Sequence, residues 1–308
     1  MEASQYRLCI SNSDVMKKFF SKLLFAAALF LCVLLAFYAV GRAIMAERSS
    51  KEKGSVFVWG DSQMYQGLDV ALLQKVSGKR VLTSAHHGGG IYDFVVSTTN
   101  VPGNCVFVSS YSEAAFFRNP TSDYNRTGMD LSALYALRKA GCPMPCCAEI
   151  IMDNRRSLVY SHVFSEQPHV LWPWSDTLEC SNEALDLWPP LFVEEKEWFP
   201  WKASAYEKGL QNLREKGVRM VLVQFPFETQ LEAIAEGSIN RHLSDSLKWS
   251  IVEELDMRCD TVVLRSDSLL MHDLSHMNEV GARMFTAELA NILRNDSVNN
   301  RFVKVMIE

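Results

Sequence analysis

Residues 56–63 read VFVWGDSQ, an apolar run followed by Gly60, Asp61 and Ser62. Four apolar residues in a row fit a strand that is buried on both faces, and a glycine after them permits a tight turn. Similar short runs recur at 80–83, 105–108, 218–223 and 261–264. Helical spacing lies between and after them, at 70–76, 131–140, 203–216 and 279–293. Strands that alternate with helices predict an α/β domain with about five parallel strands.

A long apolar run precedes this domain. Leu23–Val40 is 18 residues without a charge, and residues 41–45 extend it with one interruption at Arg42. Because about 20 apolar residues span a bilayer, we predict a transmembrane signal-anchor helix at 23–45. The alternative is a cleaved signal peptide. Its apolar region is usually only about 7–15 residues long and ends at a small-residue cleavage site, which is not evident here.

Charges beside the apolar run predict its orientation. Lys17, Lys18 and Lys22 precede the run, which favours a cytoplasmic tail at 1–22 and a chain otherwise outside the cytoplasm. The segment Met16-Lys17-Lys18-Phe-Phe is typical of a bacterial export signal. We therefore expect a single-pass protein of the bacterial inner (cytoplasmic) membrane whose α/β domain is extracytoplasmic.

Composition divides the rest of the chain. We expect a polar linker at 46–54, the α/β domain at 55–295 and a C-terminal tail at 296–308. An insertion at about 120–200 holds most of the tryptophans, interleaved with prolines that exclude one long helix. This insertion is expected to bind a glycan, to face the bilayer or a membrane protein, or to form a small core under a long loop.

Charge and cysteines limit the class of protein. The net charge of −5 and the lack of a long basic tract argue against nucleic acid as a partner. The segment GCPMPCC brings Cys142, Cys146 and Cys147 together, but its spacing is not that of a common zinc site. A loop with a disulfide, or buried free thiols, fits it better. The prediction includes no metal and no cofactor.

Two short segments carry the chemistry. Ser62 ends a predicted strand and begins a helix, where its hydroxyl is presented at the sheet edge and its N–H favours negative charge. Asp273 precedes His276 by three residues before the last helix, so its carboxylate can hold one ring nitrogen while the other takes the serine proton. A metal site that uses His272 and His276, with His86–His87, is the main chemical rival, although such a pair needs a helix to align it.

Together, Gly60-Asp61-Ser62 and 273–281 (DLSHMNEVG) resemble the SGNH/GDSL hydrolase family. The resemblance implies a flavodoxin-like three-layer sandwich, with Ser62 as nucleophile, His276 as base and Asp273 as its orienting partner. It places a second oxyanion donor at Gly89, or at Gly88. The family's Gly-x-Asn-Asp block is replaced here by 109–113 (SSYSE), so Ser110 or the later Asn119 remains as the third candidate.

The layout is similar to that of extracytoplasmic SGNH-like proteins of teichoic acid and alginate modification. It implies an esterase or O-acyltransferase that acts on acyl esters of cell-envelope glycans or polymers through an acyl-serine. A multi-pass membrane acyltransferase is the implied partner, and the lipid bilayer is contacted through residues 23–45. The alternative is a catalytically inactive SGNH-like scaffold or assembly partner, which the missing asparagine favours.

Overall fold

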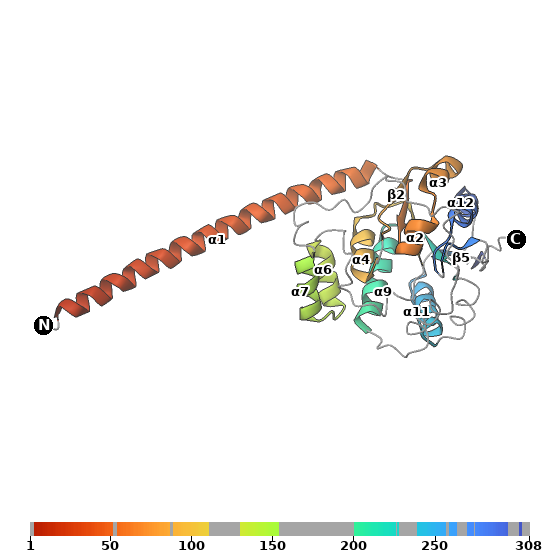
Figure 1. Ribbon diagram of the computed structural model, residues 1–308. Helices are drawn as coiled ribbons and strands as arrows, with labels where there is room; N and C mark the ends of the chain where they lie inside the picture. The colour runs from red at the N-terminus through yellow and green to blue at the C-terminus, as the bar shows by residue number, and fades with distance from the viewer. Residues whose placement is uncertain are drawn as a thin grey trace. The chain divides into compact units, whose positions relative to one another are not determined.

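The computed structural model describes most of the chain. The described residues are 3–51, 54–86, 89–110, 130–153, 200–225, 227, 239–256, 259–263, 270–273, 275–294 and 302–303. They belong to two units, Met1–Ala46 and Glu47–Glu308, which are described separately (Figure 1). The predicted Trp/Pro-rich insertion lies largely outside the described residues.

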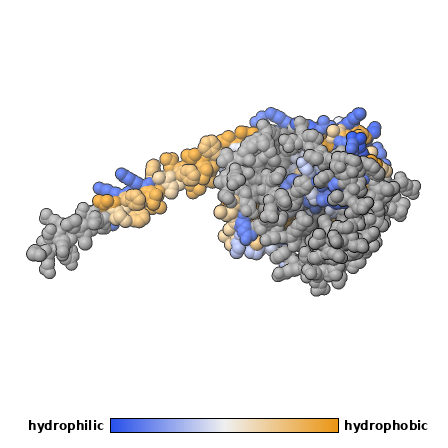
Figure 2. Space-filling view, viewed as in Figure 1, coloured by the Kyte–Doolittle hydropathy of each residue, from blue (hydrophilic) through white to orange (hydrophobic). Residues whose placement is uncertain are grey.

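The first unit belongs to one long helix, α1 (Ala3–Lys51). Its segment Val15–Gly41 has 27 residues and no buried side chains. At about 1.5 Å per residue, this segment is roughly 40 Å long, more than the ~30 Å hydrocarbon core of a bilayer. Apolar residues make up most of the described part of this helix on the face seen in Figure 2, with hydrophilic residues near its N-terminal end. The N-terminal helix therefore has the length and composition of a single membrane span or signal anchor.

The helix is longer than predicted at both ends. It begins at Ala3, within the expected tail, and it continues to Lys51 through most of the expected linker at 46–54. No glycine or proline lies between Gly41 and Gly54 to stop it, and Lys51 donates to Glu47 one turn earlier at 2.8 Å. Gly54, with φ +84°, lies just beyond the end of the helix.

A parallel sheet forms the centre of the second unit. Its order is β2-β1-β3-β4-β5-β6, and every neighbouring pair is parallel. The strands are β1 (Val56–Trp59), β2 (Val81–Thr83), β3 (Val106–Ser110), β4 (Arg219–Gln224), β5 (Cys259–Val263) and β6 (Phe302–Val303). The five predicted strands are confirmed within two residues. The short β6 lies in the expected C-terminal tail, where a two-residue run gives no periodic signal.

Helices pack on both faces of the sheet. In chain order they are α2 (Ser62–Gly67), α3 (Val70–Ser77), α4 (Ile91–Asn100), α6 (Leu131–Lys139), α7 (Met144–Asp153), α9 (Pro200–Glu215), α11 (Ile239–Glu254) and α12 (Glu279–Arg294). Val56 and Val58 of β1 join a core with α2, α3 and α12. Their neighbour Trp59 points to the opposite face and contacts Phe94 of α4 with ring centroids 5.0 Å apart. The sheet is therefore the middle of three layers.

A buried ion pair joins the amino-terminal ends of β4 and β5. The guanidinium of Arg219 lies 2.7 Å from the carboxylate of Asp260, whose side chain is fully buried. Arg219 also reaches the carbonyl of Ile292 in α12 at 3.4 Å. This pair is at the opposite end of the strands from Ser62, so its contribution is to the stability of the sheet.

The strand order also indicates where a ligand site belongs. After β1 the chain goes to β2 on one side, and it later returns to β3 on the other side of β1. In open parallel sheets, such a reversal leaves a crevice outside the carboxyl ends of the two strands, where ligands bind. Ser62 follows β1 directly and Ser110 ends β3, so both lie at this edge.

Candidate active site

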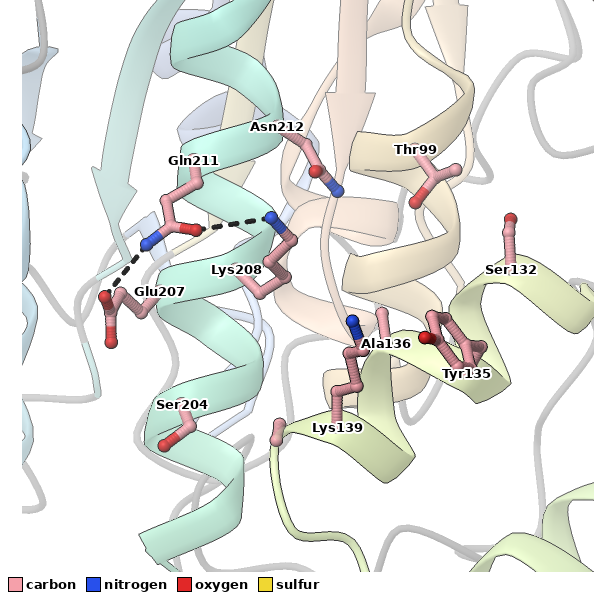
Figure 3. Close-up of a pocket in the computed structure, with 11 residues that line it drawn as sticks. Thr99, Ser132, Tyr135, Ala136, Lys139, Ser204, Glu207, Lys208, Gln211 and Asn212 are labelled. Atoms are coloured by element: carbon pink, nitrogen blue, oxygen red, sulfur yellow. Dashed lines mark hydrogen bonds between the residues drawn. The ribbon is translucent and has the colours of Figure 1, made fainter.

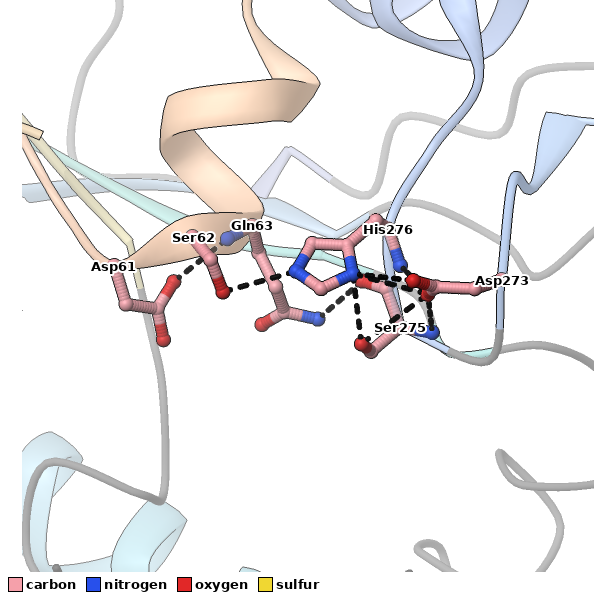
Figure 4. A network of polar contacts seen from close by, with 6 residues as sticks. All are labelled: Asp61, Ser62, Gln63, Asp273, Ser275 and His276. Atoms are coloured by element: carbon pink, nitrogen blue, oxygen red, sulfur yellow. Dashed lines mark hydrogen bonds and ion pairs between the residues drawn. The ribbon is translucent and has the colours of Figure 1, made fainter. Parts of the chain in front are cut away.

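Three predicted residues come together at this edge (Figure 4). The hydroxyl of Ser62 is 2.9 Å from Nε2 of His276, across 214 positions of sequence. Nδ1 of the same ring is 2.8 Å from Oδ2 of Asp273. A carboxylate only accepts, so Nδ1 donates to it and Nε2 is left to accept the proton of Ser62. Ser62, His276 and Asp273 therefore have the geometry of a nucleophile, a base and an orienting acid.

The turn after β1 presents Ser62. A side chain at Gly60 would meet Met64 and would place its Cβ 2.6 Å from Oγ of Ser110, so only glycine fits there. Asp61 caps α2 because its carboxylate accepts the N–H of Gln63 at 3.1 Å. Ser62 is then the first residue of α2, where backbone N–H groups have no acceptor within the helix.

Backbone hydrogen bonds fix the loop before α12 on both sides of His276. The N–H of His272 donates to the carbonyl of His276 at 2.8 Å, and the N–H of Asn278 donates to the carbonyl of Leu270 at 2.9 Å. Asn278 also caps α12 by accepting the N–H of Gly281 at 3.0 Å. A Cβ at Gly281 would collide with the carbonyl of Leu270. The N-x-x-G part of the sequence motif is thus explained by the packing of this loop on its helix.

Asp273 is held as a carboxylate. Burial alone would raise its pKa, but the hydrogen bond and charge of His276 outweigh that effect and lower the pKa below its ordinary value of 3.8. The backbone N–H groups of Ser275 and His276 add to this lowering, each donating to Oδ1 at 2.8 Å. The carboxylate therefore stays charged at neutral pH, beside Nδ1 of His276.

A contact that sequence reasoning missed joins the two halves of the site. Nε2 of Gln63 donates to the carbonyl of Ser275 at 2.9 Å (Figure 4). The contact fixes α2 against the loop of His276. Its only sequence signal is the position next to the nucleophile, because glutamine is an ordinary residue in the first turn of a helix.

The predicted oxyanion residues have different outcomes. Gly89 lies against the turn after β1, where an added Cβ would be 2.7 Å from the carbonyl of Gly60. Its N–H donates to the carbonyl of His86 at 3.3 Å. Ser110 is 6% exposed, and among the described residues its hydroxyl has no hydrogen-bond partner. Gly88 and Asn119 lie outside the described residues.

The rival metal site lacks its helix. His272 and His276 lie on the loop before α12, and His87 is outside the described residues. Within the described part of the chain, no group of three or more His, Cys, Asp or Glu side chains is arranged to hold a metal ion.

The GCPMPCC segment leads into a helix. It contributes the start of α7, and Cys142, Cys146 and Cys147 are free thiols there. Burial is the largest of the effects that raise the pKa of Cys142 and of Cys146. Lys202 of α9 is also buried, and burial lowers its pKa to about 7.

A cavity of about 410 Å³ lies elsewhere, between α4, α6 and α9 (Figure 3). Tyr135 and Lys139 of α6 line it, together with Lys208 of α9. None of the predicted site residues contributes to its lining. The chemistry predicted from the sequence therefore belongs to the edge of the sheet and not to this cavity.

Two sequence comparisons identify no relative. No protein-family model matches the chain, and no curated protein matches it in sequence. The arrangement of the site is thus the basis for any functional conclusion.

Proposed function

We propose that the protein is a serine esterase or O-acyltransferase of the SGNH/GDSL type, anchored in a membrane by its N-terminal helix. The observation that carries the proposal is the continuous hydrogen-bonded series Ser62–His276–Asp273. The order β2-β1-β3-β4-β5 supports it, since that is the order of flavodoxin-like sheets. The position of Ser62 after β1 and of Asp273 and His276 before α12 also agrees with the family pattern.

The first half-reaction forms an acyl-serine. Oγ of Ser62 attacks the ester carbonyl as its proton passes to Nε2 of His276, and the Asp273 carboxylate stabilises the imidazolium. The tetrahedral intermediate then expels the alcohol, which takes the proton from His276. In the second half-reaction, His276 removes a proton from water or from a sugar hydroxyl, and that oxygen attacks the acyl carbonyl. The bond between the acyl carbon and Oγ of Ser62 then breaks, and Oγ takes the proton back from His276.

The oxyanion needs donors near Ser62. We assign the N–H of Ser62 and the hydroxyl of Ser110, which is buried beside Gly60. The N–H of Gly89 is the third candidate, and it must leave the carbonyl of His86 to serve. Loss of one such donor lowers the rate by roughly 10²–10³ in related chemistry, so this choice is measurable.

The substrate class follows from the proposed family and anchor. We propose that the substrates are acyl esters of cell-envelope glycans or polymers. The catalytic domain would lie on the extracytoplasmic side of a bacterial inner membrane. A multi-pass membrane acyltransferase would supply the acyl group if the protein is a transferase. The alternative, an inactive SGNH-like scaffold, is favoured by one observation, the engagement of the Gly89 N–H within its own loop.

A fluorophosphonate probe on the full-length protein in detergent tests the proposal. We expect covalent labelling that is lost in Ser62→Ala and kept in Ser250→Ala, a matched change of an exposed serine on α11. Peptide mapping should place the label on Ser62. A folded wild-type protein that takes no label would refute the enzyme and leave the scaffold.

Hydrolysis and transfer separate by their products. The unlabelled enzyme is given an acetyl ester together with a saccharide acceptor, and free acetate is measured against acetylated saccharide. A transferase yields acetylated saccharide in proportion to acceptor concentration. An esterase yields acetate alone at every concentration.

A further inference from the structure

The segment after β2 is tied to the turn that presents Ser62. The N–H of His86 donates to the carbonyl of Gly60 at 3.1 Å. The carbonyl of His86 accepts the N–H of Gly89 at 3.3 Å. Gly89 in turn lies so close to Gly60 that no side chain fits between them. His86 therefore contacts both the nucleophile turn and the glycine segment through its backbone.

The side chain of His86 adds a second set of contacts. Nδ1 lies 2.8 Å from the carbonyl of Ser84, and because a carbonyl only accepts, Nδ1 is the donor. Nε2 is thus turned toward Oδ2 of Asp93 at 3.5 Å. The Asp93 carboxylate is fully buried in the first turn of α4, and the same oxygen accepts the N–H of Gly90 at 3.1 Å.

We propose that His86 and Asp93 are positioning residues that hold Gly89 and Gly90 against the turn of Ser62 during acylation. The proposal rests on the proposed function and goes beyond it, because neither side chain belongs to the Ser–His–Asp series. The carboxylate accepts the N–H of Gly90 from the α4 side. The imidazole lies 3.5 Å from that carboxylate and is held on the β2 side by the carbonyl of Ser84. These contacts form a clamp on Gly89 and Gly90.

A helix cap alone does not explain this arrangement. To cap α4, Asp93 needs only the N–H of Gly90, and no imidazole has to face it. Nε2 of His86 nevertheless lies 3.5 Å from this buried carboxylate, a contact that the cap does not require. Gly89 has no free space toward Gly60, so a displaced segment shifts the oxyanion donors relative to Ser62. A misplacement of about 1 Å in a catalytic site can lower the rate roughly 10²-fold.

The test uses saturation kinetics of fluorophosphonate labelling on the full-length protein. His86→Asn keeps a donor for the carbonyl of Ser84 and is too short to reach Asp93. Asp93→Asn keeps an oxygen for Gly90 and removes the charge. Asp130→Asn is the matched control, because Asp130 is also a buried carboxylate that caps a helix, α6, through the N–H groups of Ser132 and Ala133. Circular dichroism and the unfolding midpoint establish that each variant folds.

We expect each single variant at 86 and 93 to lower the maximal labelling rate about tenfold to a hundredfold, with the half-saturating probe concentration unchanged. The double variant should be about as slow as either single variant, because residues that act as a pair are not additive. Asp130→Asn should keep the wild-type rate. Normal rates in folded His86→Asn and Asp93→Asn would overturn the inference, as would multiplying effects in the double variant.

Amide hydrogen exchange separates this inference from the proposed function. Gly89 and Gly90 should exchange faster in both variants than in Asp130→Asn, whether or not Ser62 takes the probe. A wild-type protein that takes no label would refute the proposed enzyme. Unchanged hydrogen exchange at Gly89 and Gly90 in the two variants would refute the clamp.

Discussion

Replacing Asp273 by asparagine exchanges one carboxylate oxygen for an NH₂ group and should move the proton of His276 from Nδ1 to Nε2. Oδ1 of Asp273 accepts two backbone N–H groups, those of Ser275 and His276, each at 2.8 Å. An asparagine must place its oxygen there, since an amide NH₂ group would face two donors. Its NH₂ group then faces Nδ1 of the ring, which becomes an acceptor. The proton moves to Nε2, where it points at Ser62.

The size of the expected rate loss follows from this shift of the proton. A ring protonated at Nε2 cannot accept the proton of Ser62, and the charge that stabilises the imidazolium is gone. The same substitution in a serine protease triad lowers kcat by roughly 10⁴-fold. At about 1.36 kcal/mol for each tenfold change, that is ~5.4 kcal/mol of transition-state stabilisation. The fold should persist, because the oxygen still accepts both backbone donors.

Two measurements check this prediction, the fluorophosphonate labelling rate and the hydrolysis of an activated acetyl ester. Asp69→Asn is the control, because Asp69 caps α3 by accepting the N–H of Leu72 at 2.9 Å, and asparagine caps equally well. We expect the control to keep the wild-type rate in both assays. If folded Asp273→Asn reacts within tenfold of the wild type, Asp273 has no part in the mechanism.

Three further predictions concern the contacts around the site and the core. Arg219→Met leaves the buried Asp260 without its partner and should lower the free energy of unfolding by about 3–5 kcal/mol in denaturant titrations; a loss below about 1 kcal/mol would contradict this. Gln63→Met removes the hydrogen bond to Ser275, so labelling should slow roughly two- to tenfold, in line with a net 0.5–1.5 kcal/mol, and a wild-type rate would show the contact to be dispensable. Because the pKa of Lys202 is lowered from 10.5 to about 7, the unfolded chain binds more protons between these values. Wild-type stability should therefore rise from pH 7 toward pH 10 relative to Lys202→Met, and parallel pH profiles would refute the lowered pKa.

The strands were predictable because a strand that is buried on both faces appears in the sequence as a continuous apolar run. Runs such as VFVW and VRMVLV contain almost nothing but apolar residues, and each became a strand of the sheet. Helix α4 (Ile91–Asn100) was not predicted. Its valines and threonines have weak helix propensity, and its stability comes from packing, as Phe94 stacks on Tyr206 with ring centroids 4.8 Å apart. Tertiary contacts of this kind are not visible in a local pattern.

The site divides in the same way. Ser62 and His276 were predictable because each occupies the junction between a regular element and a loop, where the sheet edge exposes side chains. Gln63 was not, since its partner is the carbonyl of Ser275, a backbone group that any residue has. The pairing of His86 with Asp93 depends on α4, so it could not be predicted without predicting that helix. An aspartate three residues after Gly90 is the signal that would have revealed both.

The separation of Ser62 from His276 has a consequence for biosynthesis. A chain is made from its N-terminus, so the serine is synthesised more than 200 residues before its base. The base is positioned by the loop before α12, and α12 packs on α2, which begins at the serine, and on α3, the next helix. Until that last helix docks, the serine is an ordinary alcohol. Reactivity at Ser62 would therefore indicate that folding is complete. In a nascent or truncated chain without α12, Ser62 would be unreactive.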